Sequence, residues 1–255
     1  MTSTPNPTAA LLVIGDEILS GRTRDKNIGV LADFCTETGL DLREIRVVAD
    51  DMDAIIAALN ALRAGYAYVF TSGGIGPTHD DITADAVARA FGVDLPVDDR
   101  ALKAITSRYV NFEMTPARLR MARIPVGGDL IENPVSAAPG IHIGNVFVLA
   151  GVPVIFEAML NSLAGRLATG VKLGTETVDC WVGEGTIGDE LGIIQQTYPT
   201  VKIGSYPQFG GPGPMTQLVL RSADMGALAE AAIAVRAMVD RVHREKDITP
   251  AKRAK

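Results

Sequence analysis

The 255-residue chain has little of what would place it in several common protein classes. Its two cysteines, Cys35 and Cys180, fall in a predicted helix and a predicted strand, so we expect buried free thiols rather than a disulfide or a metal site. Basic residues number 24 against 30 acidic ones, which argues against nucleic acid as a partner. No apolar run reaches the roughly 18 residues of a membrane span. The first ten residues lack the features of a signal peptide, so we expect a cytoplasmic protein with no membrane partner.

A glycine-rich stretch, TSGGIGPTHDDIT at residues 71–83, joins a predicted buried strand at 66–70 to a predicted helix at 84–91. Gly73, Gly74 and Gly76 leave backbone N–H groups able to face an anion near the positive end of the next helix. The stretch lacks the Lys of a P-loop and the spacing of the dinucleotide fingerprint. We therefore expect a different kind of phosphate-binding loop.

Two carboxylates, Asp80 and Asp81, follow the glycines. They would repel a bare phosphate, so we expect them to hold a divalent cation between the protein and the phosphate. The alternative is that one of them, or Thr83, caps the helix.

The remaining pattern predicts an α/β fold, with a mostly parallel sheet flanked by helices. Strands at 9–14 and 40–49 alternate with helices at 25–38 and 54–64, and helices are also expected at 98–110 and 115–123. Residues 125–140 are predicted to form a long surface loop that covers a binding site. A hairpin at 141–149 and a helix from Pro153 to about residue 170 complete a first domain, 1–170. A strand-helix-strand-strand-helix pattern predicts a small α+β domain at 171–245, and 246–255 is expected to be a flexible tail.

Acidic residues follow the first two predicted strands: Asp16 and Glu17 come after Gly15, and Asp50 comes after residue 49. The carboxyl ends of parallel strands meet at one edge of a sheet, which is where α/β proteins place ligands. Capping by Asp16 and solvation of Glu17 and Asp50 are the alternatives. Asn27 lies at a predicted helix start, where it contacts a ligand or caps the first turn.

Five motifs resemble the competence/damage-inducible protein A family, whose N-terminal domain is a molybdopterin-binding (MoCF-like) domain. They are GGIGPTHDDIT at 73–83, IGDEILSG at 14–21, DKN at 25–27, NPVSAAPG at 133–140 and AGVP at 150–153. The motifs span the first two thirds of the chain. Molybdopterin-biosynthesis relatives usually carry Arg-Asp where this chain has Asp80-Asp81, so the double Asp favours the competence/damage-inducible branch.

The resemblance implies an ADP-ribose pyrophosphatase-like hydrolase that releases AMP and ribose 5-phosphate with Mg, Mn or Co. We expect Asp80 and Asp81 to bind the metal, and the catalytic carboxylates to be Asp81, Asp50, Glu17 and Asp16. The predicted ligand-contact residues are Gly15, Asn27, Gly73, Gly74, Gly76, Pro77, Thr78, Asn133, Ser136, Gly140, Gly151 and Pro153. Full-length members carry a further domain that deamidates nicotinamide mononucleotide. This chain ends at Lys255, too early to include it, so we predict no amidohydrolase activity.

Two alternatives to hydrolysis stay open. One is a molybdopterin- or nucleotide-binding or adenylylating module of cofactor biosynthesis, and the other is a non-catalytic nucleotide-sensing protein. The ligand is a small nucleotide or pterin in each reading. The resemblance also implies a homo-oligomer, because related domains often associate.

Overall fold

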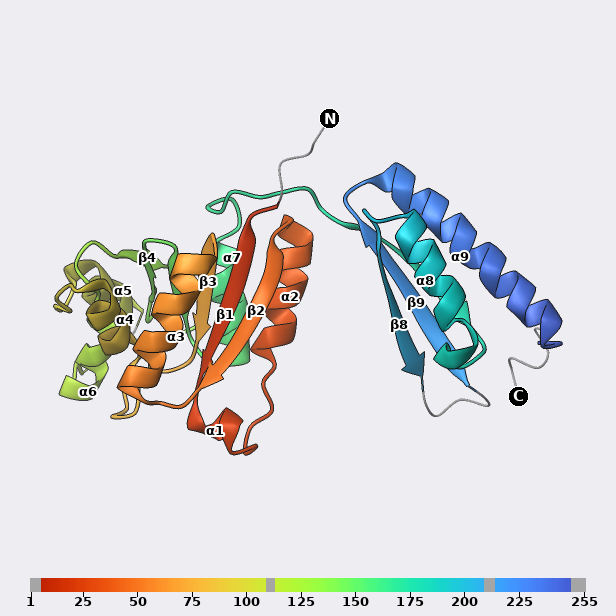
Figure 1. The fold of residues 1–255 in the computed structure, drawn as a ribbon. Helices are drawn as coiled ribbons and strands as arrows, with labels where there is room; N and C mark the ends of the chain where they lie inside the picture. The colour runs from red at the N-terminus through yellow and green to blue at the C-terminus, as the bar shows by residue number, and fades with distance from the viewer. Residues whose placement is uncertain (1–5, 109–112, 209–213, 249–255) are drawn as a thin grey trace. The chain divides into compact units, whose positions relative to one another are not determined.

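A computed structural model describes residues 6–108, 113–208 and 214–248, and the chain divides into two compact units, 1–171 and 172–255. The elements of the first unit are β1 (Thr8–Ile14), α1 (Asp16–Leu19), α2 (Asn27–Thr38), β2 (Asp41–Val48), α3 (Met52–Gly65), β3 (Tyr68–Ser72), α4 (Thr83–Phe91), α5 (Asp99–Ser107), α6 (Pro116–Leu119), the 3-10 helix η1 (Arg120–Ala122), β4 (Asp129–Ile131), β5 (Gly140–Ile143), β6 (Val146–Leu149) and α7 (Pro153–Ser162). Those of the second are β7 (Gly174–Cys180), η2 (Glu184–Thr186), α8 (Gly188–Thr197), β8 (Lys202–Gln208), β9 (Met215–Ser222) and α9 (Met225–Glu245) (Figure 1).

The first unit is built on a sheet whose described strands run in the order β2-β1-β3-β6-β5-β4. The four strands from β2 to β6 are parallel, and β5 and β4 add an antiparallel edge. At the centre, Leu11 of β1 pairs with Ile45 of β2 on one side and Phe70 of β3 on the other. β1 is apolar and buried from Ala9 to Ile14, as expected for a central strand whose two faces are both covered. The predicted α/β fold with a mostly parallel sheet is confirmed.

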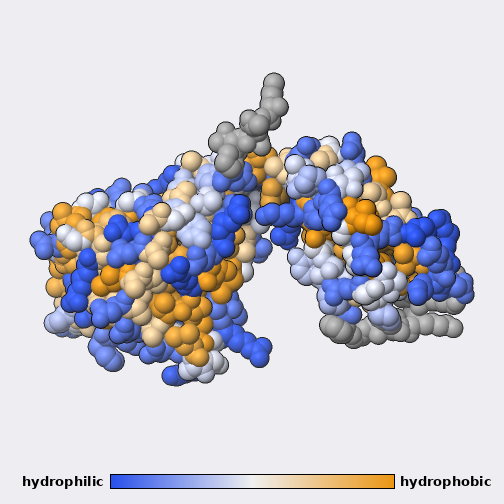
Figure 2. Space-filling model, viewed as in Figure 1, coloured by the Kyte–Doolittle hydropathy of each residue, from blue (hydrophilic) through white to orange (hydrophobic). Residues whose placement is uncertain are grey.

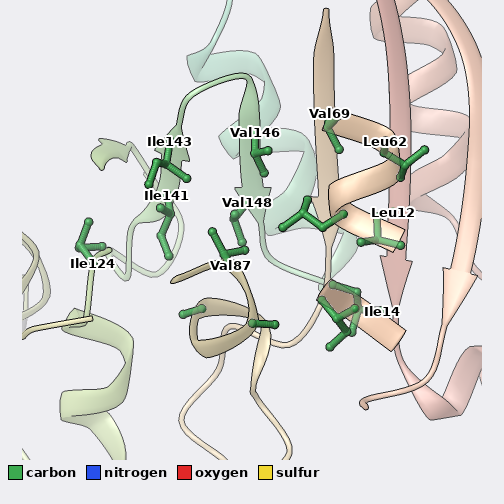
Figure 3. Packing of buried hydrophobic residues seen from close by; sticks show 14 of the residues in the cluster. Leu12, Ile14, Leu62, Val69, Val87, Ile124, Ile141, Ile143, Val146 and Val148 are labelled. Carbon is green, nitrogen blue, oxygen red and sulfur yellow. The ribbon is translucent and has the colours of Figure 1, made fainter. Parts of the chain in front are cut away.

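Helices cover both faces of this sheet, and alternate residues of each strand point to opposite layers. Leu12, Ile14, Val69 and Val148 belong to one buried cluster, together with residues of α3, α4 and α5 (Figure 3). Leu11, Val13, Phe70 and Leu149 belong to the other, with residues of α2 and α7. The sheet is thus held between two apolar layers, so its strand ends have fixed positions.

The segment predicted to be a structureless loop, 125–140, contains strand β4. Its three residues pair antiparallel with β5, as in Leu130 opposite Ile141. The prediction was wrong here because a strand this short has no period of its own and is stabilised by its partner. The predicted helix at 115–123 is split into α6 and η1, and the last residues of the one expected at 98–110 lie outside the described residues.

The second unit has an antiparallel sheet in the order β7-β9-β8, with its own core. Leu218 and Leu220 of β9 are buried against Leu228 and Val235 of α9. At the end of α9, Ile248 packs on this core and its backbone N–H donates to the His243 carbonyl oxygen at 2.8 Å. Residues 249–255 of the predicted tail lie outside the described residues.

Hydrophilic residues are mixed with smaller apolar areas on the visible face of each unit (Figure 2). Both cysteines are buried and neither forms a disulfide, as predicted. Burial raises the pKa of the Cys35 thiol to about 12, and the negative charge of Asp41 adds to this effect. Among the described residues, no helix combines the length and apolar character needed to cross a membrane.

Candidate functional site

A pocket of about 560 Å³ lies at the carboxyl ends of β1, β3 and β6, where Gly15, Gly73 and Gly151 follow the strands. After β1 the chain forms β2 on one side of β1 and then β3 on the other side, so the strand order reverses at β1. Open parallel sheets bind ligands where the strand order reverses. The pocket is within the size range of small-molecule sites.

The glycine-rich loop 73–82 forms one wall of this pocket, and its glycines are required by its own packing. Gly73 and Gly74 have φ of 109° and 66°. A Cβ on Gly73 would lie 2.2 Å from the carbonyl oxygen of Ile14, and one on Gly74 would lie 2.2 Å from the Thr83 hydroxyl. The glycines therefore let β1, β3 and α4 approach one another. The missing side chains also let a ligand approach the backbone closely.

Asp81 organises this loop from within. Its Oδ1 accepts a hydrogen bond from the backbone N–H of Gly76 at 2.7 Å, and its Oδ2 accepts one from that of Thr78 at 2.8 Å. The Thr78 hydroxyl lies 2.5 Å from both Asp81 Oδ2 and Asp80 Oδ1, so its single hydrogen can serve one carboxylate at a time. Neither Asp caps α4 in the ordinary way, since the position before the helix is Ile82.

Two buried polar side chains anchor the loop to the sheet. The Thr83 hydroxyl donates to the carbonyl oxygen of Gly73 at 2.9 Å. The amide nitrogen of Asn27 donates to the Ser72 hydroxyl at 2.7 Å and to the Gly151 carbonyl oxygen at 2.8 Å. Asn27 is 2% exposed and ties α2 to the ends of β3 and β6, while Asp25 accepts the hydrogen bond from the Ile28 amide at the helix start. Asn27 therefore lies beneath the pocket.

Asp50 is a pocket carboxylate whose pKa is raised. Asp51 caps α3, which leaves Asp50 free to accept a hydrogen bond from the Asp16 backbone N–H at 2.9 Å. Burial raises the pKa of Asp50, the charges of Asp16, Glu17 and Asp80 raise it further, and the hydrogen bond opposes them. A raised pKa makes Asp50 a better proton acceptor than an ordinary Asp. The hydrogen bond from Thr78 lowers the pKa of Asp80.

The loop that follows β4 closes another side of the pocket through Asn133, Ser136 and Ala138. The Asn133 amide donates to the Ser136 hydroxyl at 2.6 Å and to the Ala138 carbonyl oxygen at 2.8 Å. Its Oδ1 accepts from the backbone N–H groups of Val135 and Ser136. These contacts use the full hydrogen-bonding capacity of the amide, so Asn133 shapes the loop.

Most of the predicted site residues line the pocket: Gly15, Glu17, Asp50, Gly73, Gly74, Gly76, Pro77, Asp80, Asp81, Asn133, Ser136, Gly151 and Pro153. Four others, Asp16, Asn27, Thr78 and Gly140, do not line it. Asp16 is exposed and Asn27 is buried below, while Thr78 bonds within its loop. Gly140 leaves no room for a side chain, because a Cβ at this position would lie 2.5 Å from the Val148 carbonyl oxygen.

Sequence reasoning missed eight lining residues, most of them apolar: Ile14, Thr23, Ile75, Met121, Ala138, Ala150, Val152 and Ile155. Several lie inside or beside the motifs already noted, so proximity to a motif could have indicated them. Met121 is the exception, because it comes from η1 and no local signal connects that segment with the glycine loop.

The pocket holds the carboxylates of Glu17, Asp50, Asp80 and Asp81, and no Lys or Arg is among its described lining residues. Within the described residues, no three His, Cys, Asp or Glu side chains are arranged to hold a metal ion. The donor set still fits Mg²⁺ held by one or two carboxylates together with ligand phosphates, and the Asp80 side chain is 62% exposed.

Comparisons with known proteins point to two families. Residues 10–169 match the model described as a probable molybdopterin binding domain, and residues 172–246 match the middle domain of FAD synthase. Protein Ta0487 of Thermoplasma acidophilum is 40% identical over 159 residues, which are 61% of this chain and 62% of that protein. This chain thus covers less than two thirds of the length of Ta0487.

Two further relatives extend the match. A protein of Archaeoglobus fulgidus is 31% identical over 200 residues, which are 78% of this chain and 86% of that protein. The crystal structure of CinA from Thermoplasma acidophilum, a protein of unknown function, superposes with a TM-score of 0.60 at 38% identity. The superposition covers 64% of this chain and 99% of that chain.

Proposed function

This chain belongs to the family of probable molybdopterin-binding domains, and we propose that its pocket binds a small phosphate-bearing ligand, a nucleotide or a pterin. The observation that carries the proposal is the glycine-rich loop at the edge of the pocket, ahead of α4. Among the described residues, the backbone N–H groups of Gly74 and Ile75 have no hydrogen-bond acceptor of their own. Free N–H groups near a helix N-terminus favour a phosphate.

The remainder of the pocket supports a ligand with a ring and hydroxyl groups. Its apolar side chains suit a heterocycle, and its carboxylates accept hydrogen bonds from ribose hydroxyls or from ring amino groups. A nucleotide and a phosphorylated pterin both offer these groups.

Calorimetric titration of the purified chain with AMP, ADP-ribose and a phosphorylated pterin tests the proposal, with and without Mg²⁺. We expect saturable binding of at least one of them, and the order of their Kd values identifies the ligand class. Absence of binding by all three, under both conditions, would contradict the proposal.

A second candidate function is metal-dependent hydrolysis of a phosphoanhydride such as ADP-ribose, and the carboxylates of the pocket favour it. A divalent cation would neutralise the phosphate oxygens that these carboxylates repel, with Asp80 as its protein ligand. Asp50 or Glu17 would accept a proton from the attacking water. The water oxygen would bond to phosphorus and the anhydride P–O bond would break, which gives AMP and ribose 5-phosphate.

Release of AMP from ADP-ribose, measured with Mg²⁺, Mn²⁺, Co²⁺ or a chelator, separates the two candidates. Release that requires a metal supports hydrolysis, whereas binding without release leaves the binding function alone. Metal binding by Asp81 and the homo-oligomer stay predictions. The two oxygens of Asp81 are already occupied by N–H groups of the loop, which makes Asp80 the better metal ligand.

A further inference from the structure

The segment η1 brings a methionine to the pocket from a part of the chain about 40 residues beyond the glycine loop. Met121 lines the pocket between two arginines, Arg120 and Arg123, whose guanidinium groups turn toward α4. The methionine contributes to the pocket wall, and the arginines attach its segment to the rest of the unit.

The attachment is a bidentate ion pair. Arg123 donates from Nη1 to Asp85 Oδ1 at 2.9 Å and from Nη2 to Asp85 Oδ2 at 2.7 Å. Arg120 donates from Nη2 to the Asp81 carbonyl oxygen at 3.0 Å, and the same nitrogen lies 3.9 Å from Asp85 Oδ2. The Arg123 and Asp85 side chains are 23% and 31% exposed, so the pair is partly shielded from water. Two parallel hydrogen bonds fix orientation as well as distance.

Met121 faces a pocket that already has a polar end and an apolar wall. The glycine loop supplies backbone N–H groups for a phosphate, while Met121, Ile75, Val152 and Ile155 supply apolar contact. Methionine is flexible and polarizable, and its sulfur makes favourable contacts with aromatic rings. A flat heterocycle is therefore the part of a nucleotide or pterin that suits this wall.

We infer that Met121 determines specificity for the ring of the ligand, and that Asp85 with Arg120 and Arg123 acts as a clamp that positions it. The inference rests on the proposed binding function. It assigns the phosphate of the ligand to the glycine loop and the ring to the apolar wall. Removal of Met121 should affect a ligand that has a ring and spare a ligand that lacks one.

The test compares AMP, which has the ring, with ribose 5-phosphate, which has the sugar and phosphate alone. For Met121→Ala we expect the Kd of AMP to rise about tenfold, the lower range for loss of apolar contact in a pocket, with the Kd of ribose 5-phosphate unchanged. Met114→Ala is the matched control, because Met114 is also partly buried against the core and is not among the residues that line the pocket. It should leave both Kd values as they are.

The clamp is tested through the preference for AMP, which is the ratio of the Kd of ribose 5-phosphate to the Kd of AMP. Arg123→Lys keeps the charge and loses the bidentate geometry, so the preference for AMP should fall. When Arg123→Lys is added to Met121→Ala, the preference should fall no further than in Met121→Ala alone. Arg100→Lys serves as the control, because Arg100 lies in α5 and forms its ion pairs with Asp98 and Asp129. Thermal unfolding of each variant confirms that the measured chains are folded.

Three outcomes decide the matter. Wild-type chain that binds neither AMP nor ribose 5-phosphate overturns this inference, whereas the proposed function is overturned only if ADP-ribose and a phosphorylated pterin are not bound either. Wild-type chain that prefers AMP, with the same preference in Met121→Ala, overturns the role of Met121 alone. A further loss of preference when Arg123→Lys is added to Met121→Ala would overturn the clamp, because Arg123 would then act by another route.

Discussion

Asp81 and Asp80 are neighbouring carboxylates with different contacts. Asp81 accepts hydrogen bonds from two backbone N–H groups of its loop, whereas Asp80 is exposed and contacts the Thr78 hydroxyl. Asp81→Ala should lower the free energy of unfolding by about 1–3 kcal/mol, because it leaves two loop N–H groups without their acceptor. Asp80→Ala should change it by less than about 0.5 kcal/mol. Urea unfolding of both variants measures this difference. A loss of unfolding free energy for Asp81→Ala as small as that for Asp80→Ala would show that the loop does not depend on Asp81.

The raised pKa of Asp50 predicts a pH dependence of stability. Between the ordinary Asp pKa of 3.8 and the raised value, the folded chain binds more protons than the unfolded chain, so the free energy of unfolding falls as pH rises. Above that window the charge destabilises the fold. Asp50→Asn removes the charge and keeps an oxygen that can accept the Asp16 N–H. It should raise the Tm at about pH 7, and the gain should shrink toward about pH 4.

Asp33→Asn, which changes an exposed carboxylate of α2, is the control for this comparison. It should leave the Tm unchanged at both pH values. If Asp50→Asn lowers the Tm at neutral pH, the hydrogen bond to Asp16 outweighs the charge. The same variant should also weaken any hydrolysis that needs Asp50 as a proton acceptor.

At the scale of elements, the junction between β3 and the glycine loop depends on the absence of a side chain. A Cβ on Gly73 would lie 2.2 Å from the Ile14 carbonyl oxygen, at a φ of 109°. Gly73→Ala should therefore cost roughly 2–4 kcal/mol of unfolding free energy. Gly65→Ala, at the end of α3 with no atom within 4 Å of the added Cβ, should be neutral or stabilising by up to about 1 kcal/mol. Denaturant unfolding should show a loss of stability for Gly73→Ala and none for Gly65→Ala, and a tolerated Gly73→Ala would mean that β1 and β3 can separate at the loop.

The elements that sequence reasoning found are those with a strong local pattern. Gly39 and Gly92 end α2 and α4 in the left-handed conformation, with φ of 71° and 67°, as their positions after apolar helical runs suggest. β4 was missed because three residues show no period. Met121 was missed as a site residue because its segment is held beside α4 by an ion pair between Arg123 and Asp85, which lie 38 positions apart.

The site residues show the same limit. Gly73, Gly74 and Asp81 were identified from a dense motif, and they do line the pocket. The hydrogen bonds of Asp81 and Asn133 could not be predicted, because a motif gives residue types without showing which atoms face a ligand and which face their own loop.

At the scale of the whole molecule, the two units have separate apolar cores. The superposition on the crystallised CinA chain covers 64% of this chain and 99% of that chain. We therefore expect a fragment of residues 1–171 to fold by itself and to bind the same ligands as the full chain. Circular dichroism and calorimetric titration of this fragment check both expectations. A fragment that is unfolded, beside a folded full chain, would show that the second unit is needed for stability.

The parallel pairing of β3 with β6 also sets the order in which the pocket can be completed. Val69 pairs with Val146 across 77 positions of the chain, and the pocket needs Gly151 and Pro153 beyond them. Contacts this distant in sequence form slowly, because a long loop must close before they contribute. During synthesis, the glycine loop would leave the ribosome long before its partner strand exists. The ability to bind a ligand should therefore appear late, and a ligand added to a refolding chain would report the last step rather than the first.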